Sequence, residues 1–77
     1  MGFNKDRFLA LNIEILKFML NEAFQKRKHV KWDFLYREFS EYSKEEIDFS
    51  IRYLKDKGYL IDFEITAKGV DEVLKWI

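Results

Sequence analysis

The side chains that commonly carry covalent or metal chemistry are scarce in this chain. It has no cysteine, and its single histidine, His29, has no second histidine or cysteine nearby to share a metal ion. There is no glycine-rich phosphate loop, and the carboxylates Glu45 and Glu46 are explained by capping a helix. We therefore predict that the chain is not an enzyme and that it holds neither a metal nor a cofactor.

The charged residues are balanced. Lysine and arginine together number 14, as do aspartate and glutamate, so the formal net charge is zero. A chain without net positive charge lacks the general electrostatic attraction by which a basic domain binds nucleic acid. The only dense basic run spans residues 26–31. It is either a phosphate-contacting patch or a solvated loop whose cations suit the C-terminus of the preceding helix.

The most clearly delimited helix is predicted over about residues 43–57. Ser43 followed three residues later by Glu46 forms a capping box, and Gly58 supplies the C-terminal stop. Apolar residues spaced at i, i+4 and i+7 give one stripe for burial, which consists of Ile47, Ile51 and Leu54.

A longer helix is predicted over about residues 6–27, capped by Asn4 or Asp6. Its apolar arc covers about 240°, which is more than a surface helix of a small domain needs. Either this helix is central and wrapped by the others, or one edge packs against a second copy of the chain. We favour the second interpretation and predict a homodimer through this helix and the C-terminal helix. Trp76 is either partly covered by the first helix or part of an interface.

A short helix is predicted over about residues 33–40, with Asp33 as its cap. Val30 has the position of a one- or two-residue strand ahead of it. Three apolar residues share a face and should join the core: Trp32, Leu35 and Phe39.

After Gly58 the hydrophobic pattern changes to a period of two over residues 59–66. One side would carry Tyr59, Ile61, Phe63 and Ile65, and the other Leu60, Asp62, Glu64 and Thr66. Thr66 then caps a final helix over about residues 67–77, in which Gly69 is expected to permit close backbone packing. The apolar stripe of that helix consists of Val70, Val73, Leu74 and Ile77.

In this order the elements resemble the winged helix–turn–helix superfamily, in particular its small bacterial, phage and archaeal members. The most specific residues are Ile47, Ser50, Ile51 and Leu54, then Gly58-Tyr59-Leu60-Ile61, then Ile65-Thr66-x-Lys68-Gly69. The resemblance implies a single domain over residues 1–77 that is mainly α with a small antiparallel hairpin. It also implies that helix 43–58 is a recognition helix that enters the DNA major groove, and that dimers read paired half-sites.

Two features depart from the pattern of that superfamily. Only seven residues separate Gly58 from Thr66, so the wing is short, and its charged residues are Asp62 and Glu64, which phosphates repel. The exposed side of the recognition helix also carries carboxylates at positions 45, 48 and 56. Phe49 on the same side lies where a DNA reader more often has a polar group.

The leading prediction for function is a small dimeric DNA-binding regulator. The residues predicted to contact duplex DNA are Lys31, Lys44, Arg52 and Lys55, with Arg52 the best candidate for a base contact. No targeting signal is visible, and Glu14 and Lys17 interrupt the first apolar segment. We therefore expect a cytoplasmic protein without a membrane span.

The alternative is a protein-interaction adaptor that binds no nucleic acid. Its partner surface would comprise Phe49, Tyr53 and Trp76 together with the acidic short wing. Phe49 and Tyr53 lie one turn apart and have a second interpretation, in which their rings cover adjacent core.

Overall fold

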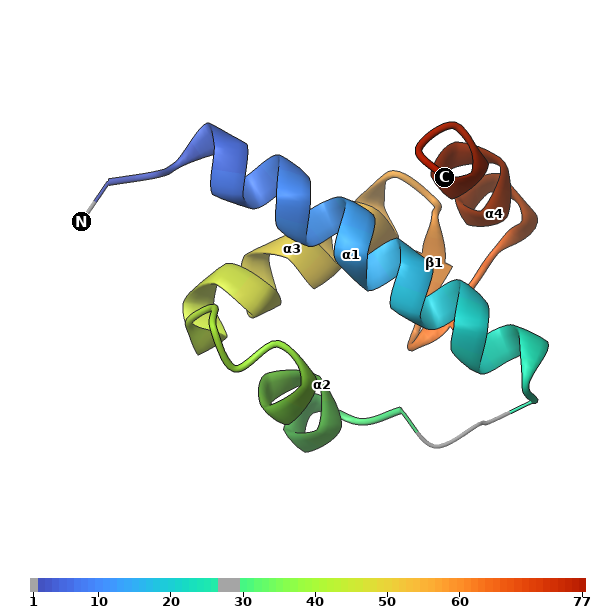
Figure 1. Ribbon diagram of the computed structural model, residues 1–77, viewed down its shortest axis with the longest axis horizontal. Helices are drawn as coiled ribbons and strands as arrows, with labels where there is room; N and C mark the ends of the chain where they lie inside the picture. Colours follow the sequence, from blue (N-terminus) through green and yellow to red (C-terminus); the bar gives the residue numbers. More distant parts are fainter. Residues whose placement is uncertain (1, 27–29) are drawn as a thin grey trace.

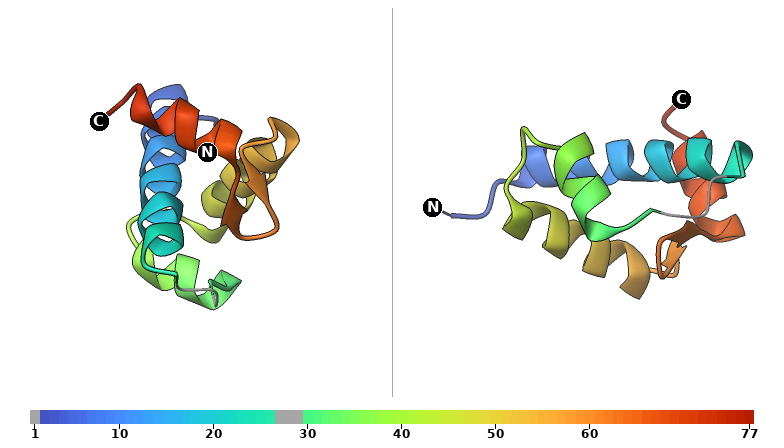
Figure 2. Two further views of the ribbon diagram at one scale, coloured as in Figure 1. Left: turned by 90° about the vertical axis from the view of Figure 1, so that its right-hand side faces the viewer. Right: turned by 90° about the horizontal axis from the view of Figure 1, so that it is seen from below.

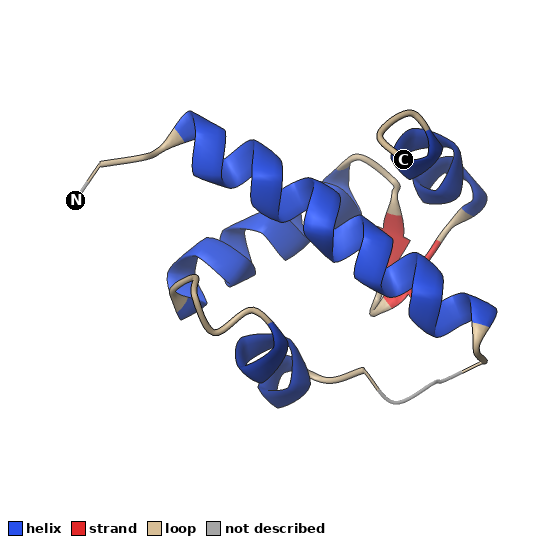
Figure 3. Ribbon diagram, in the orientation of Figure 1, coloured by secondary structure: helices blue, strands red, loops and turns tan. Residues whose placement is uncertain are grey.

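The computed structural model describes residues 2–26 and 30–77. Within them the chain is mainly helical with one small antiparallel hairpin, as the sequence predicts (Figure 3). The elements are α1 (Lys5–Phe24), α2 (Trp32–Glu38), α3 (Lys44–Asp56), β1 (Leu60–Ile61), β2 (Glu64–Ile65) and α4 (Ala67–Leu74) (Figure 1). In this part of the chain no helix combines the length and the apolar character needed to cross a bilayer.

Side-chain caps fix the starts of three helices. Asn4 accepts a hydrogen bond from the backbone N–H of Arg7 at 3.1 Å, and Thr66 accepts one from Gly69 at 3.1 Å. Ser43 and Glu46 form the predicted capping box at the start of α3. The cap predicted for α2 is wrong, because the helical backbone already begins at Trp32. Asp33 therefore lies in the first turn, and Lys31 occupies the N-cap without a side-chain hydrogen bond.

α1 lies at the centre of the fold. It contacts α3, α4 and β2, and in Figure 2 α3 runs beneath it. The core side chains that α1 contributes are Leu11, Ile15, Leu16 and Met19. These contacts support the interpretation of a central helix wrapped by the others. The helix ends at Phe24, three residues before its predicted end, and the exposed ring of Phe24 has no place in the core.

The hairpin departs from the predicted alternation. Leu60 pairs with Ile65 and Ile61 pairs with Glu64 across a two-residue loop, in which Asp62 adopts a positive φ of 54°. Directly paired residues share a face of the sheet, so Leu60 is buried beside Ile65 whereas Ile61 is exposed. A single continuous period of two is wrong here because the chain reverses direction halfway through it. The strand suggested at Val30 is not formed either, since this residue lies in the loop before α2.

α4 packs closely on the hairpin through its glycine. A Cβ built on Gly69 would lie 2.3 Å from the carbonyl oxygen of Tyr59, so only glycine fits, as predicted. Val73 is fully buried, but α4 ends at Leu74, short of the predicted end at residue 77. Ile77 therefore leaves the helical stripe, and both Leu74 and Ile77 are exposed.

Candidate functional site

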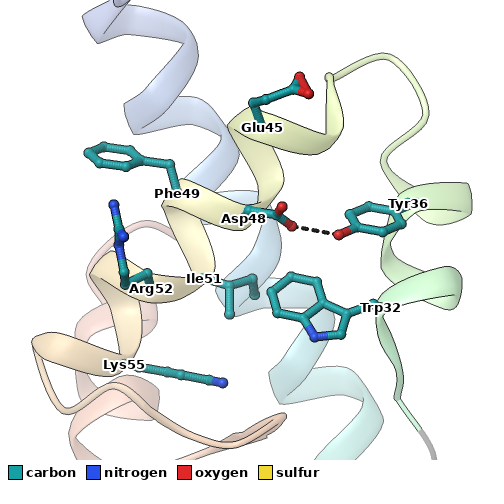
Figure 4. A pocket seen from close by; sticks show the side chains of 8 residues that line it. All are labelled: Trp32, Tyr36, Glu45, Asp48, Phe49, Ile51, Arg52 and Lys55. Carbon is teal, nitrogen blue, oxygen red and sulfur yellow. Dashed lines mark hydrogen bonds between the residues drawn. The ribbon is translucent and has the colours of Figure 1, made fainter.

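α3 separates its apolar and polar residues between two faces. Its buried side consists of Ile47, Ser50, Ile51 and Leu54, as the predicted stripe requires. The side next to it borders a groove of about 680 Å³ between α2 and α3, which we call the α2–α3 groove (Figure 4). The groove is lined by Trp32 and Tyr36 from α2 and by Glu45, Asp48, Phe49, Ile51, Arg52 and Lys55 from α3.

One hydrogen bond fixes the two walls of the α2–α3 groove. The hydroxyl of Tyr36 donates to Oδ1 of Asp48 at 2.6 Å (Figure 4). Because this bond stabilises the protonated phenol, it raises the pKa of Tyr36 to about 12, with smaller contributions from desolvation and from the negative charge of Asp48. The bond also occupies Asp48, one of the two carboxylates that line the groove.

The predicted cations of α3 lie over aromatic rings rather than beside carboxylates. The ammonium of Lys44 is 5.2 Å from the ring centroid of Tyr36, and the guanidinium of Arg52 is 5.5 Å from that of Phe49. The ammonium of Lys55 is 5.2 Å from the ring of Phe63. None of these three cations forms an ion pair with a carboxylate of the described residues. Cation–π contacts hold such side chains in place without neutralising their charge.

Three of the four predicted DNA contacts therefore meet at this groove, and the fourth adjoins it. Arg52 and Lys55 line it, and Lys44 lies over Tyr36 in its wall. Lys31 is exposed at the N-cap of α2, next to Trp32. Of the basic run at 26–31, Arg27, Lys28 and His29 lie outside the described residues.

The aromatic wall of the groove is the part that the sequence did not single out. Trp32 was expected in the core, yet it is partly exposed and stacks on Tyr36 with ring centroids 5.8 Å apart. The tip of the hairpin also reaches this wall, since the ring of Phe63 lies 5.2 Å from that of Trp32 in an edge-on contact. The spacing of Trp32 and Tyr36 at i and i+4 was the available signal for a shared face.

The rings predicted as a partner surface pack against α1, although Phe49 also lines the α2–α3 groove. Phe49 and Tyr53 lie 5.4 and 5.1 Å from Phe8 of α1. They remain 43% and 39% exposed. This packing favours the interpretation in which the two rings cover adjacent apolar surface. Trp76 lies past the end of α4 and is 58% exposed, with its indole nitrogen 3.5 Å from Glu72.

We compared the chain with protein-family models, curated proteins and solved structures. Nothing matched. The functional assignment therefore comes from the geometry and the charge of the site.

Proposed function

We propose that the chain is a small winged-helix protein that binds double-stranded DNA through α3. The observation that carries this proposal is the set of cations at the α2–α3 groove, none of which is paired with a carboxylate of the described residues. Supporting it is the order of the elements, in which α2, a short turn and α3 precede a hairpin and a last helix.

α3 has the properties that a major-groove helix needs. The major groove of B-DNA is about 12 Å wide and admits one α-helix with its side chains. Arg52 is exposed near the middle of the outer face of α3, so its guanidinium can bond to a guanine edge in the bidentate manner typical of arginine. Lys31 and Lys44 lie at the N-terminal ends of α2 and α3, where lysine contacts to phosphate position a helix on the duplex.

A dimer is the second part of the proposal. Exposed apolar side chains gather at the C-terminal end of the chain, namely Leu74, Trp76 and Ile77. A symmetric pair of chains joined there would cover this surface and present two copies of α3. Two half-sites would then be spaced by about 34–36 Å, one turn of the duplex. Sedimentation velocity at high micromolar concentration measures this directly, and a monomer there contradicts the dimer.

The DNA proposal is tested by titrating a fluorescent random-sequence duplex with the full chain at low salt and following its anisotropy. The double variant Arg52→Ala, Lys55→Ala should bind about tenfold more weakly, because it loses one base contact and one phosphate contact. The matched control is Lys17→Ala, Lys75→Ala, which removes the same charge from lysines that are paired with Glu14 and Glu72. Equal losses in both double variants, or no loss in the first, would refute the role of the groove.

A further inference from the structure

A second cavity lies on the other side of α3. It has a volume of about 630 Å³ and is bordered by the N-terminal parts of α1 and α3, so we call it the α1–α3 cavity. Its apolar lining comprises Phe3, Phe8, Leu11 and Phe49. A volume in this range suits a small molecule.

The three phenylalanines of the cavity form one cluster. The ring centroids of Phe3 and Phe8 are 5.2 Å apart, and those of Phe8 and Phe49 are 5.4 Å apart. The planes meet at 56° and 50° rather than stacking in parallel. Tilted contacts leave part of each ring face, which carries the negative part of the aromatic quadrupole, uncovered by the other rings, and the guanidinium of Arg52 already lies 5.5 Å over the ring of Phe49. Phe3 is 68% exposed, so much of this aromatic surface is open to a ligand.

Among the described residues, the one cation that lines the cavity is already engaged. Arg7 donates from Nε to Glu46 at 2.8 Å and from Nη2 to the same carboxylate at 3.0 Å. It also donates to the carbonyl oxygen of Glu41 at 3.2 Å and lies 4.7 Å over the ring of Tyr42. Arg7 and Glu46 together contribute no net charge to the cavity.

One carboxylate of the cavity is left without a compensating charge. Glu45 lines the same space and forms no ion pair with any described residue. Its negative charge stands beside open aromatic faces, and both attract a cation. An anionic ligand would meet repulsion from Glu45 and from the ring faces alike.

We propose that the α1–α3 cavity binds a small organic cation that carries an aromatic group. The charged head of such a ligand would lie between Glu45 and the ring faces, and its apolar part would cover the exposed surface of Phe3 and Phe49. None of the predicted DNA contacts lines this cavity, although Glu45 and Phe49 border both it and the α2–α3 groove.

The test is an NMR titration of the ¹⁵N-labelled full chain with benzyltrimethylammonium at low salt. Saturable shifts are expected at the amides of Phe8, Ser43 and Ser50, which border this cavity and not the α2–α3 groove. Phenylacetate, which has the same ring and the opposite charge, should cause no saturable shift there. Benzyl alcohol should bind more weakly than the cation.

Two variants distinguish the contribution of the carboxylate to binding from that of the rings. Glu45→Gln should weaken binding of the cation by about two- to fivefold, the size of one exposed interaction with a cation, whereas Glu64→Gln on β2 should leave it unchanged. Phe8→Leu keeps an apolar side chain but removes the central ring, so it should weaken binding of the cation. Unchanged dispersion of the amide signals would verify that this variant is folded. The proposal is overturned if phenylacetate binds as tightly as the cation, if Glu45→Gln behaves like Glu64→Gln, or if the shifts centre on the α2–α3 groove.

Discussion

The two cavities beside α3 differ in the charged side chains that line them. On one side, Arg52 and Lys55 line a groove in which the carboxylate of Asp48 is occupied by Tyr36. On the other side, carboxylates and phenylalanines line a cavity in which Arg7 is occupied by Glu46. The zero net charge of the chain therefore conceals two different linings: the groove balances Arg52 and Lys55 against two carboxylates, whereas the cavity has one carboxylate more than it has cations among the described residues.

The different linings of the two spaces follow from the helical periodicity of α3. At 100° per residue, positions 44, 52 and 55 fall within about 80° of one another, and the buried stripe lies beside them. Glu45 and Phe49 lie further round the outer face of α3 and line both the α2–α3 groove and the α1–α3 cavity. Asp48 falls within the same arc, so the cations of α3 share their face with a carboxylate that accepts the hydrogen bond of Tyr36.

The largest expected effect comes from removing the core side chain that both sides of α3 depend on. Ile51 is 1% exposed and also lines the α2–α3 groove. Ile51→Ala should lower the free energy of unfolding by about 2–4 kcal/mol, since it deletes buried methylene and methyl groups and leaves a cavity. Urea unfolding followed by circular dichroism measures the change.

The exposed Ile61 provides the control for that variant, because Ile61→Ala removes the same atoms from a side chain that lies outside the core. Its free energy of unfolding should stay within about 0.5 kcal/mol of the parent chain. Equal losses from the two variants would mean that α3 does not pack as described.

A smaller, pH-dependent effect tests the α1–α3 side. The hydrogen bonds from Arg7, followed by the backbone N–H of Ser43, lower the pKa of Glu46 to about 2. Because the pKa of Glu46 is lower in the folded chain than its ordinary value of 4.5, the pair stabilises the fold above that pH and loses its effect as the pH falls towards 2. Glu46→Gln retains an acceptor oxygen for the capping box but removes the charge and the second oxygen, which accepts the hydrogen bond from Nε of Arg7.

The free energy of unfolding of the parent chain should therefore exceed that of Glu46→Gln at pH 6, and the two should converge as the pH falls from about 4.5 to 2. Urea unfolding at a series of pH values gives both curves. A difference that stays constant down to pH 2 would show that charge is not the source of the stabilisation.

The smallest expected effect concerns the α2–α3 side. Asp48→Asn removes the carboxylate that accepts the hydrogen bond of Tyr36, so the pKa of Tyr36 should fall from about 12 towards its ordinary value of 10.0. The raised pKa means that this contact stabilises the fold below about pH 10 and ceases to do so as the pH rises through 12. Absorbance at alkaline pH follows the tyrosine titration, and Asp56→Asn on the exposed side of α3 serves as the control. An unchanged titration in Asp48→Asn would contradict the contact.

Local signals predicted much of the fold. The capping box at Ser43, the cap at Thr66 and the stripe of Ile47, Ile51 and Leu54 are short-range features that one helix determines for itself. The hairpin was mispredicted around Leu60 because a reversal of the chain resets the alternation, and period alone does not reveal where the reversal occurs.

The site was predictable only in part. The cations of α3 share a face by helical spacing, so Lys44, Arg52 and Lys55 could be selected from sequence. The bond between Tyr36 and Asp48 joins different helices, and so do the contacts of Phe49 with Phe8. Such contacts depend on how α1, α2 and α3 pack, which no local pattern encodes.

The salt dependence of duplex binding tests the central claim most directly. If Lys31, Lys44 and Lys55 neutralise phosphates, a plot of the logarithm of the association constant against the logarithm of salt concentration should have a slope of about −2 to −3. The slope for Arg52→Ala, Lys55→Ala should be shallower by about 1, because Lys55 is the phosphate contact that this variant loses. A slope near zero for the parent chain, or the same slope in both proteins, would contradict the assignment of α3 as the DNA-binding helix.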